Sequence, residues 1–429
     1  MSSRKLEVDY LARVEGEGKM YVNIEDDVVK EARLEIFEPP RFYEGFLRGR
    51  KYTEAPDITS RICGICPIAY ITSSSQAMEQ ILGIEVEGRL RDLRRLIYCG
   101  EWIESHGLHA FMLHAPDFLG YQDSIQMAAD HPEIVKKALK VKKIGNDIVS
   151  TMAGREIHPI NTKVGGFYRA PKKEELEGLV EDLKWGLETC HEMLEWGATL
   201  DYPDLERDYE FVALRHPEEY AIDRGRIVSN KGIDIEADEF DEYFEEIQME
   251  HSTSFYAKVK GRGYYLTGPL ARYTLNFEQL SDSAKEAAIN AGLGEECYNP
   301  FKSLPVRLVE MIYVYEEALR IIADYERPEK PTLDLKPKAG VGHGVSEAPR
   351  GLLYHSYKID DEGTIEDATI VPPTAQNQGA IEEDLKDFVA ARLEMEDDKL
   401  QWQCEQAIRN YDPCISCSCH FLNLTVDRD

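Results

Sequence analysis

The chain has 429 residues, which is enough for one large domain or for two to three ordinary ones. Hydrophobic residues make up 43% and charged residues 30% of it, a composition typical of a folded globular protein and not of a disordered or fibrous one. Lys and Arg total 50 against 80 Asp and Glu, and because the resulting net charge of −30 repels phosphate backbones and anionic lipid, no nucleic acid is expected as a partner.

Neither a membrane span nor a secretion signal is visible. No run approaches the roughly 18 to 20 consecutive apolar residues that a transmembrane helix needs, and residues 1–16 lack the apolar stretch of a signal peptide. We therefore expect a cytoplasmic protein with no direct membrane insertion. The chain also has no GxGxxG or P-loop motif, so any flavin or nucleotide must be bound by another chain.

The first predicted element in chain order is a β-hairpin. Lys19–Asn23 and Val28–Phe37 alternate apolar and polar residues on either side of Asp26 and Asp27, a pair that favours a tight turn. This hairpin region covers about residues 5–40, and we expect it to start the chain as a short sheet.

Long helices are predicted for the middle of the chain. Apolar residues recur at helical spacing in three stripes, which begin at Leu93, Leu176 and Leu308. A second hairpin is predicted from Gly351–Ile359 and Thr364–Val371, followed by a helix that begins at Ile381. The predicted fold class is mostly α with small peripheral β-sheets (α+β), arranged around a central helix bundle, in a single domain spanning residues 1–429.

Two further features are interpreted as structural. The acidic segment from Ile233 to Glu250 is expected to be a solvated face or an insertion, without chemistry of its own. Four cysteines stand alone and are expected to be packed as small hydrophobic residues: Cys99, Cys190, Cys297 and Cys404.

Two CxxC pairs lie near opposite ends of the chain. Cys63 and Cys66 occur in RICGIC, and Cys414 and Cys417 occur in DPCISC. Two such pairs make a tetrathiolate cage, for which zinc or an iron–sulfur cluster is the usual occupant. Structural zinc sites normally join a few tens of residues, whereas soft thiolates also select nickel and iron. A zinc-clamped scaffold therefore remains an alternative to a catalytic metal site.

With these motifs the sequence resembles the large, catalytic subunit of nickel–iron hydrogenases, whose signatures are RxCGxC and DPCxxC. The resemblance extends along the whole chain through RVEG at Arg13–Gly16, RFYEGFLRGR at Arg41–Arg50, GREIHP at Gly154–Pro159 and EAPRG at Glu347–Gly351. The segments EPPRFYE, CPIAY and HPINTKVGGFYRAP most resemble the cytoplasmic bidirectional, NAD(P)-linked branch of these hydrogenases, also called sulfhydrogenases. The resemblance implies the large-subunit fold and reversible, heterolytic cleavage of H2.

The resemblance also implies the ligands of the metal centre. Cys63 and Cys414 would be terminal thiolates on nickel, and Cys66 and Cys417 would bridge nickel to an iron that carries carbon monoxide and cyanide. Metal coordination removes the protons of the thiols, and the basic sulfurs then accept a proton from hydrogen.

Further residues receive catalytic or cofactor-binding roles by the same resemblance. Glu15 would be the first proton relay and Cys414 the sulfur that receives the proton. Arg350 would hold a guanidinium over the metals, and Pro349 and Thr374 would line the pocket around the iron-bound cyanides. Without the family, Glu15 would be read as a surface charge at the end of a strand and Arg350 as a salt-bridge partner.

A second metal ion and a maturation step are implied for the C-terminal metal-binding segment 410–420. Glu44 and His420 resemble ligands of a hard divalent ion, often Mg²⁺. Residues 421–429 lie beyond the histidine at which relatives are cut once nickel is inserted, and we expect this tail to be removed.

The sequence departs from many relatives at two positions. Tyr70 stands where they have a histidine that donates to a bridging sulfur, and a phenol is also a donor. Ser105 lies near the position of an Asp beside the active site, and it is assigned no role. His106 and His109 are three apart on one helix face, and we interpret them as packing or subunit-contact residues and not as metal ligands.

Electrons need an exit, because the chain has no further cysteine set for an iron–sulfur relay. The expected partners are an iron–sulfur small subunit and, behind it, subunits that bind flavin and NAD(P). The remaining alternative within this fold is a metal-free electron-transfer or structural subunit like those of respiratory complex I, against which the four cysteines argue.

Overall fold

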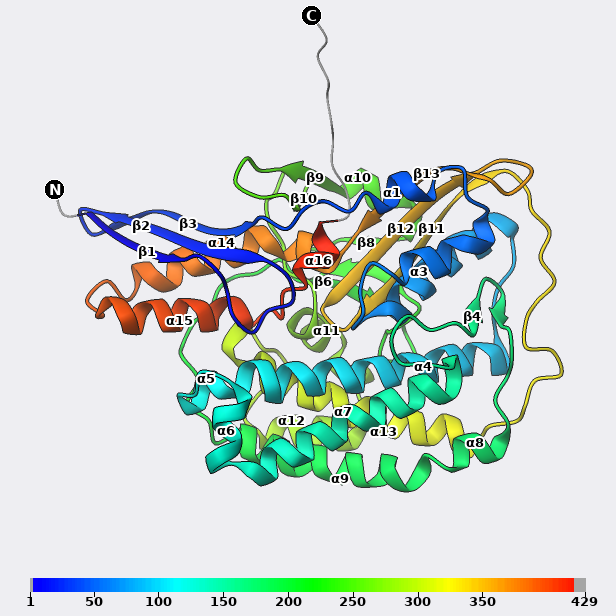
Figure 1. Ribbon diagram of the computed structural model, residues 1–429, viewed down its shortest axis with the longest axis horizontal. Helices are drawn as coiled ribbons and strands as arrows, with labels where there is room; N and C mark the ends of the chain where they lie inside the picture. Colours follow the sequence, from blue (N-terminus) through cyan, green and yellow to red (C-terminus); the bar gives the residue numbers. More distant parts are fainter. Residues whose placement is uncertain (1–2, 420–429) are drawn as a thin grey trace, which may run out of the picture.

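A bundle of long helices forms one side of the molecule, the lower half in Figure 1. The computed structural model describes residues 3–419. The members of the bundle are α4 (Gly88–Gly107), α7 (Pro132–Ala153), α9 (Val180–Gly197) and α13 (Ser303–Ala323). Helix α4 packs on α7 and α13, and α13 packs on α9. The helices predicted from the three apolar stripes are confirmed, whereas α7 has no counterpart among the predicted elements.

Helices α4 and α7 cross with their backbones nearly in contact. A Cβ atom added to Gly145 of α7 would lie 2.6 Å from the carbonyl oxygen of Gly100 in α4, a distance that no side chain tolerates. Glycine at both positions therefore allows the crossing. The crossing fixes α4, whose Glu101 accepts hydrogen bonds from the amides of Ile68 and Ala69, just after Cys66.

The N-terminal sheet has three strands, β1 (Ser3–Val8), β2 (Gly18–Glu25) and β3 (Val28–Ile36). The hairpin of β2 and β3 confirms the prediction, and its turn residues Asp26 and Asp27 have positive φ angles of 49° and 59°, as a tight hairpin turn requires. Strand β1 was not predicted, because Leu6 is its one buried residue and it lacks the alternation of a half-buried strand.

A second three-stranded sheet packs on helix α3 (Pro67–Leu82), and the two cross in the upper right of Figure 1. Its strands are β11 (Gly340–Ala348), β12 (Gly351–Ile359) and β13 (Ile365–Val371), so the predicted second hairpin is confirmed and gains a strand. Cβ atoms on Gly342 and Gly344 would lie 2.2 Å and 2.0 Å from backbone oxygens of α3. These glycines let α3 lie directly on β11, which brings the end of the helix near Cys66 to the turn that carries Arg350.

Three helices complete the C-terminal part: α14 (Pro373–Ala390), α15 (Asp397–Arg409) and α16 (Ile415–Ser418). The prediction that a helix begins at Ile381 is wrong by two turns, because α14 already begins at Pro373, a residue suited to the first turn. Its first turns contain Gln376, Asn377 and Gln378, which are buried and hydrogen-bonded. Buried amides interrupt the apolar stripe on which the prediction rested.

The remaining elements are short. The small sheets contain β4 (Thr162–Lys163) with β5 (Gly166–Phe167), β6 (Val212–Arg215) with β7 (Arg226–Ser229) and β8 (Asp234–Ile235), and β9 (Phe244–Gln248) with β10 (Phe255–Val259). The other helices are α1 (Tyr43–Leu47), η1 (Tyr52–Glu54), α2 (Ala55–Thr59), η2 (Leu108–His114), α5 (Ala115–Leu119), α6 (Ser124–Asp130), α8 (Lys173–Glu177), η3 (Ala237–Glu239), α10 (Phe240–Tyr243), α11 (Pro269–Asn276), η4 (Phe277–Gln279), α12 (Asp282–Asn290) and η5 (Pro300–Lys302).

The acidic segment from Ile233 to Glu250 spans β8 to β9. Ile235, Phe240 and Phe244 are buried in a small apolar cluster, while Asp234, Asp241 and several neighbouring acids are exposed. The segment thus presents a solvated acidic face, as predicted, but it also contributes a small core of its own.

The isolated cysteines are packed thiols. Cys99, Cys190, Cys297 and Cys404 are all buried, and burial raises the pKa of Cys297 to about 11 and that of Cys404 to about 12. None of the helices in the described part of the chain has the length and apolar content needed to cross a bilayer.

Candidate metal centre

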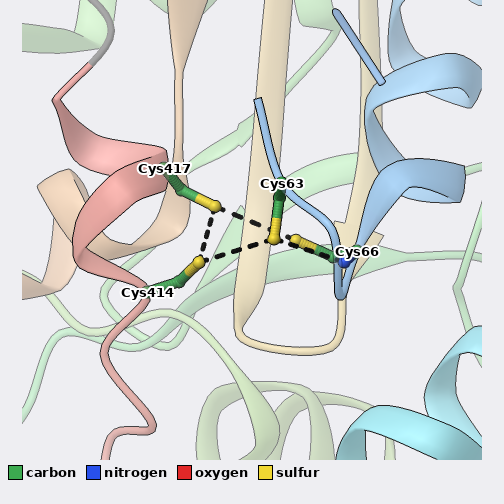
Figure 2. A group of neighbouring side chains, drawn as sticks. All are labelled: Cys63, Cys66, Cys414 and Cys417. Atoms are coloured by element: carbon green, nitrogen blue, oxygen red, sulfur yellow. Dashed lines mark hydrogen bonds between the residues drawn. The ribbon is translucent and has the colours of Figure 1, made fainter. Parts of the chain in front are cut away.

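The two CxxC pairs meet inside the protein (Figure 2). The four sulfur atoms lie within 4.8 Å of one another, and all four side chains are buried. The Sγ atom of Cys414 lies 2.7 Å from that of Cys417 and 3.6 Å from that of Cys63, and the Sγ atoms of Cys66 and Cys417 are 4.0 Å apart. The structure therefore confirms that residues from opposite ends of the sequence form one thiol cluster.

Backbone geometry holds each pair in place. Cys63 and Cys66 lie in the loop between α2 and α3, where the amides of Ile65 and Cys66 each donate to the Cys63 Sγ at 3.3 Å. Cys414 precedes the short helix α16, and its amide donates to the Thr374 hydroxyl oxygen at 2.9 Å. Thr374 thus fixes the backbone of a cluster cysteine, a contact that the sequence does not predict.

Two residues outside the CxxC motifs stabilise this arrangement, and neither was predicted. Arg41 donates through Nη2 to the carbonyl oxygen of Ile62, at 2.9 Å, and to that of Ser416, so one guanidinium joins both cysteine loops. Glu101 is buried in α4 and accepts hydrogen bonds from the amides of Ile68, at 2.5 Å, and Ala69, at 3.0 Å. It satisfies the first free amides of α3 from another helix, a capping contact that no local sequence signal reveals.

The cluster fits a metal centre on physical grounds. The four thiols are free of disulfides, and the Cys63 sulfur already accepts from the amides of Ile65 and Cys66. Hydrogen bonds with Cys414 and then Cys417 lower the pKa of Cys63 well below its usual value, while burial raises that of Cys414. Because several thiolates this close repel one another, the ionised cluster requires a cation, and soft sulfur selects nickel, iron or zinc.

Glu15 lies against the cluster. Its Oε2 accepts a hydrogen bond from the Cys414 thiol at 3.1 Å and another from the Ser416 amide at 3.0 Å, and the Ile415 amide donates to its backbone oxygen at 2.8 Å. The side chain is half-buried, so it lies between the cluster and solvent. This is the position that a proton relay needs.

Arg350 is buried in the turn between β11 and β12. It donates through Nε to the Asp412 carbonyl oxygen at 2.8 Å and through Nη2 to the Asp412 carboxylate at 3.0 Å. Burial opposes its charge, but Asp412 and the thiolates of Cys414, Cys66 and Cys63 raise its pKa well above the usual value. Its Nη1 has no hydrogen-bond partner among residues 3–419, so a donor remains free beside the cluster.

The other predicted site residues are placed as follows. Pro349 is buried next to Arg350, and its carbonyl oxygen accepts from Arg272 at 2.9 Å. Glu44 is buried in α1, where its Oε1 accepts from the Ile370 amide at 2.8 Å. His420 and the tail 421–429 lie outside the described residues, so the pairing of Glu44 with His420 is untested.

Of the two departures from the resembled family, Tyr70 lies close to the cluster. Tyr70 is buried in α3, its hydroxyl has no partner within the described part of the chain, and burial followed by the cluster thiolates raises its pKa well above the usual value. Ser105 is buried in α4. His106 contacts Glu310 at 2.8 Å and His109 contacts the Arg409 carbonyl oxygen at 2.7 Å, so both pack as predicted.

Comparison with known proteins places these features in a family. The sequence profile of nickel-dependent hydrogenases matches residues 41–146 and 310–420, the regions that contain both CxxC pairs. Sulfhydrogenase 1 subunit alpha of Pyrococcus furiosus is 32% identical over 97% of this chain and 98% of its own, and sulfhydrogenase 2 subunit alpha of the same organism is 34% identical over 98% and 100%.

Two further relatives are named for their acceptor. The beta subunit of the NAD-reducing hydrogenase HoxS of Cupriavidus necator is 27% identical over 98% of this chain and 95% of its own. The crystal structure of an NAD⁺-reducing [NiFe]-hydrogenase in the H2-reduced state superposes with a TM-score of 0.88 at 26% identity, covering 97% of this chain and 99% of the other. The match to this structure therefore extends over nearly the whole chain.

Proposed function

This chain belongs to the nickel-dependent hydrogenase family, and from this premise we propose a route by which its residues split hydrogen and pass on the electrons. The chain is the catalytic subunit of a nickel–iron hydrogenase. The observation that carries this conclusion is the convergence of Cys63, Cys66, Cys414 and Cys417 within 4.8 Å in a buried site. Hydrogen-dependent reduction of a viologen dye by the purified enzyme tests it.

The chain supplies the ligands and the environment of the centre. Cys63, Cys66, Cys414 and Cys417 would hold the nickel and the iron, and carbon monoxide and cyanide would be further ligands of the iron. When bound, this centre supplies the Lewis acidity that polarises H2 for heterolytic cleavage. The burial of all four sulfurs excludes bulk water from the reacting atoms.

The proton leaves along two residues of this chain. Cys414 Sγ receives it and passes it to Glu15 Oε2, which lies 3.1 Å away. The Ser416 amide, which donates to the same oxygen, stabilises the carboxylate form once Glu15 has released the proton towards solvent. Arg350 is held by Asp412 and keeps its Nη1 donor free, and its permanent positive charge near the cysteines would stabilise the negative charge that develops on splitting hydrogen. Pro349 and Thr374 would line the pocket around the diatomic ligands.

Electrons would leave through an iron–sulfur small subunit that docks beside the first cysteine loop. Gly64 is exposed although Cys63 and Cys66 are buried, so the first cysteine loop reaches the surface here. A Cβ on Gly64 would lie 3.8 Å from Ile157, which is 54% exposed, and Ile160 and Tyr168 nearby are 56% and 64% exposed. Exposed apolar side chains of this kind mark a protein interface.

The double substitution Ile157→Glu with Ile160→Glu should detach the small subunit, because it places two charges in an apolar interface. We expect at least a tenfold loss of co-purifying iron–sulfur subunit. The matched control is Ile125→Glu, on α6 and 83% exposed, which should retain the partner. Equal retention of the partner by both variants would exclude this docking surface.

The final acceptor is proposed to be NAD(P), reached through partner subunits that bind flavin and NAD(P). Support comes from relatives named as NAD-reducing hydrogenases and from the absence of nucleotide motifs in this sequence. Use of this acceptor would place the enzyme in the cytoplasm. Hydrogen-dependent reduction of NAD⁺ or NADP⁺ by the co-purified complex tests the assignment.

Removal of residues 421–429 should accompany metal loading. Cleavage after His420 would allow that residue to join Glu44 on a second ion such as Mg²⁺ and close the segment that carries Cys414 and Cys417. Intact-mass measurement of the active, nickel-loaded subunit should give a C-terminus at His420. A C-terminus at Asp429 in the active enzyme would end this hypothesis.

A further inference from the structure

Arg272, in helix α11, is a fully buried cation that no step above uses. All five of its N–H groups donate hydrogen bonds. Three go to carboxylates: Nε to Glu310 Oε1 at 2.8 Å, Nη2 to Glu310 Oε2 at 2.8 Å and Nη1 to Glu347 Oε2 at 3.1 Å. A guanidinium whose donors are all used at these distances is held in one orientation.

The other two donors of Arg272 reach the turn that carries Arg350. Nη1 donates to the Ala348 carbonyl oxygen at 2.8 Å, and Nη2 donates to the Pro349 carbonyl oxygen at 2.9 Å. Pro349 and Arg350 are the two residues that connect β11 to β12. Arg272 thus binds the backbone immediately before Arg350, whose own side chain binds Asp412.

The same turn is packed against the start of α11. A Cβ atom on Gly268 would lie 2.6 Å from the Arg350 carbonyl oxygen, and one on Gly351 would lie 2.7 Å from the Thr267 side chain. Both glycines have positive φ angles, 112° and 141°. The turn therefore has little room to shift, provided that Arg272 stays in place.

Arg272 is in turn held by the helix bundle. Glu310 of α13, its main partner, also contacts His106 of α4 at 2.8 Å and accepts from the Tyr220 hydroxyl at 2.8 Å. The guanidinium carbon lies 4.2 Å from the ring centre of Trp102, whose indole N–H donates to the Glu347 carbonyl oxygen at 3.0 Å. This chain of contacts connects the rigid helices to the turn beside the cysteine cluster.

We propose that Arg272 is a positioning residue for the hydrogenase reaction: it fixes the Pro349–Arg350 turn so that the Arg350 guanidinium faces the thiolate cluster. The inference rests on the proposed role of Arg350. A lysine cannot reproduce it, because one ammonium group cannot donate to Glu310, Glu347 and both carbonyls together. The competing explanation is that Arg272 only stabilises the fold.

A double-mutant cycle separates the two explanations. Arg272→Lys should lower turnover at least tenfold with nickel and iron retained, and it should shift the infrared bands of the iron-bound ligands in the same direction as Arg350→Lys. In the Arg350→Lys background, Arg272→Lys should lower turnover no further. Arg95→Lys is the matched control, because Arg95 is an equally buried arginine of α4 that forms ion pairs with Asp223 and Glu317, neither of which is a partner of Arg272. It should leave turnover and bands unchanged.

Several outcomes would overturn the inference. Arg272 would have only a structural role if Arg272→Lys kept wild-type turnover or if Arg95→Lys lost as much turnover as Arg272→Lys. The same conclusion would follow if the losses of turnover from Arg272→Lys and Arg350→Lys multiplied in the double mutant. If Arg272→Lys does not yield folded enzyme, Glu347→Gln decides, since it keeps the shape and weakens one contact to Arg272. It should shift the bands part of the way towards those of Arg350→Lys, and unshifted bands would reject the proposal. Lack of any effect of Arg350→Lys itself would instead refute the proposed function of Arg350.

Discussion

Replacing Cys417 by serine should leave the subunit without nickel and iron and without hydrogenase activity. Cys417 Sγ lies 2.7 Å from Cys414 Sγ and 4.0 Å from Cys66 Sγ, so it is central to the cluster. A serine oxygen is hard and is not ionised near neutral pH, and it cannot bridge two soft metals. Metal analysis should find both metals below a tenth of their wild-type content, and the infrared bands of bound carbon monoxide and cyanide should disappear.

The matched control for this prediction is Cys297→Ser. Cys297 is also buried, and its thiol donates to the Asn299 carbonyl oxygen at 3.8 Å, so a serine hydroxyl there finds an acceptor. This variant should keep both metals and its activity. Full metal content and full band intensity in Cys417→Ser would remove Cys417 from the ligand set.

Replacing Glu15 by glutamine should lower turnover at least tenfold, equivalent to about 1.4 kcal/mol in the activation barrier, while both metals stay bound. The amide keeps the size of the side chain, and its oxygen still accepts from the Ser416 amide. It cannot accept and release the proton of Cys414, whose sulfur lies 3.1 Å from the carboxylate. Steady-state turnover with a viologen dye, measured beside metal content, checks the prediction.

Glu17→Gln provides the control for Glu15. Glu17 is two residues further along the same segment and is exposed, so it undergoes the same chemical change away from the cluster. It should retain wild-type turnover. Wild-type turnover in Glu15→Gln would exclude Glu15 from the proton relay, and loss of metal would show instead that the residue mainly holds the C-terminal loop.

Local patterns predicted the parts of the fold whose signals are local. The hairpin of β2 and β3 follows from alternation around Asp26 and Asp27, and α13 follows from its apolar stripe. The start of α14 was missed because Gln376 and its neighbours are polar yet buried, so tertiary hydrogen bonds replace the apolar pattern there. Strand β1 was missed because it buries little.

The site residues that lie within recognisable sequence motifs were predicted. The CxxC pairs indicated a metal cage, and the resemblance to hydrogenases indicated Glu15 and Arg350, which the structure places beside the thiols. Arg41 and Arg272 could not be found in this way. Their partners are backbone carbonyls and carboxylates far away in the sequence, and such contacts exist only once the chain has folded.

The identity of the bound metal tests the central claim most directly, because a buried tetrathiolate cluster also suits zinc, and a metal-free subunit is the other alternative. Elemental analysis of the active subunit, purified without chelator, should find one nickel and one iron per chain, accompanied by infrared bands of iron-bound carbon monoxide and cyanide. One zinc per chain, or no metal in a folded subunit, would contradict the assignment of Cys63, Cys66, Cys414 and Cys417 as ligands of a nickel–iron centre.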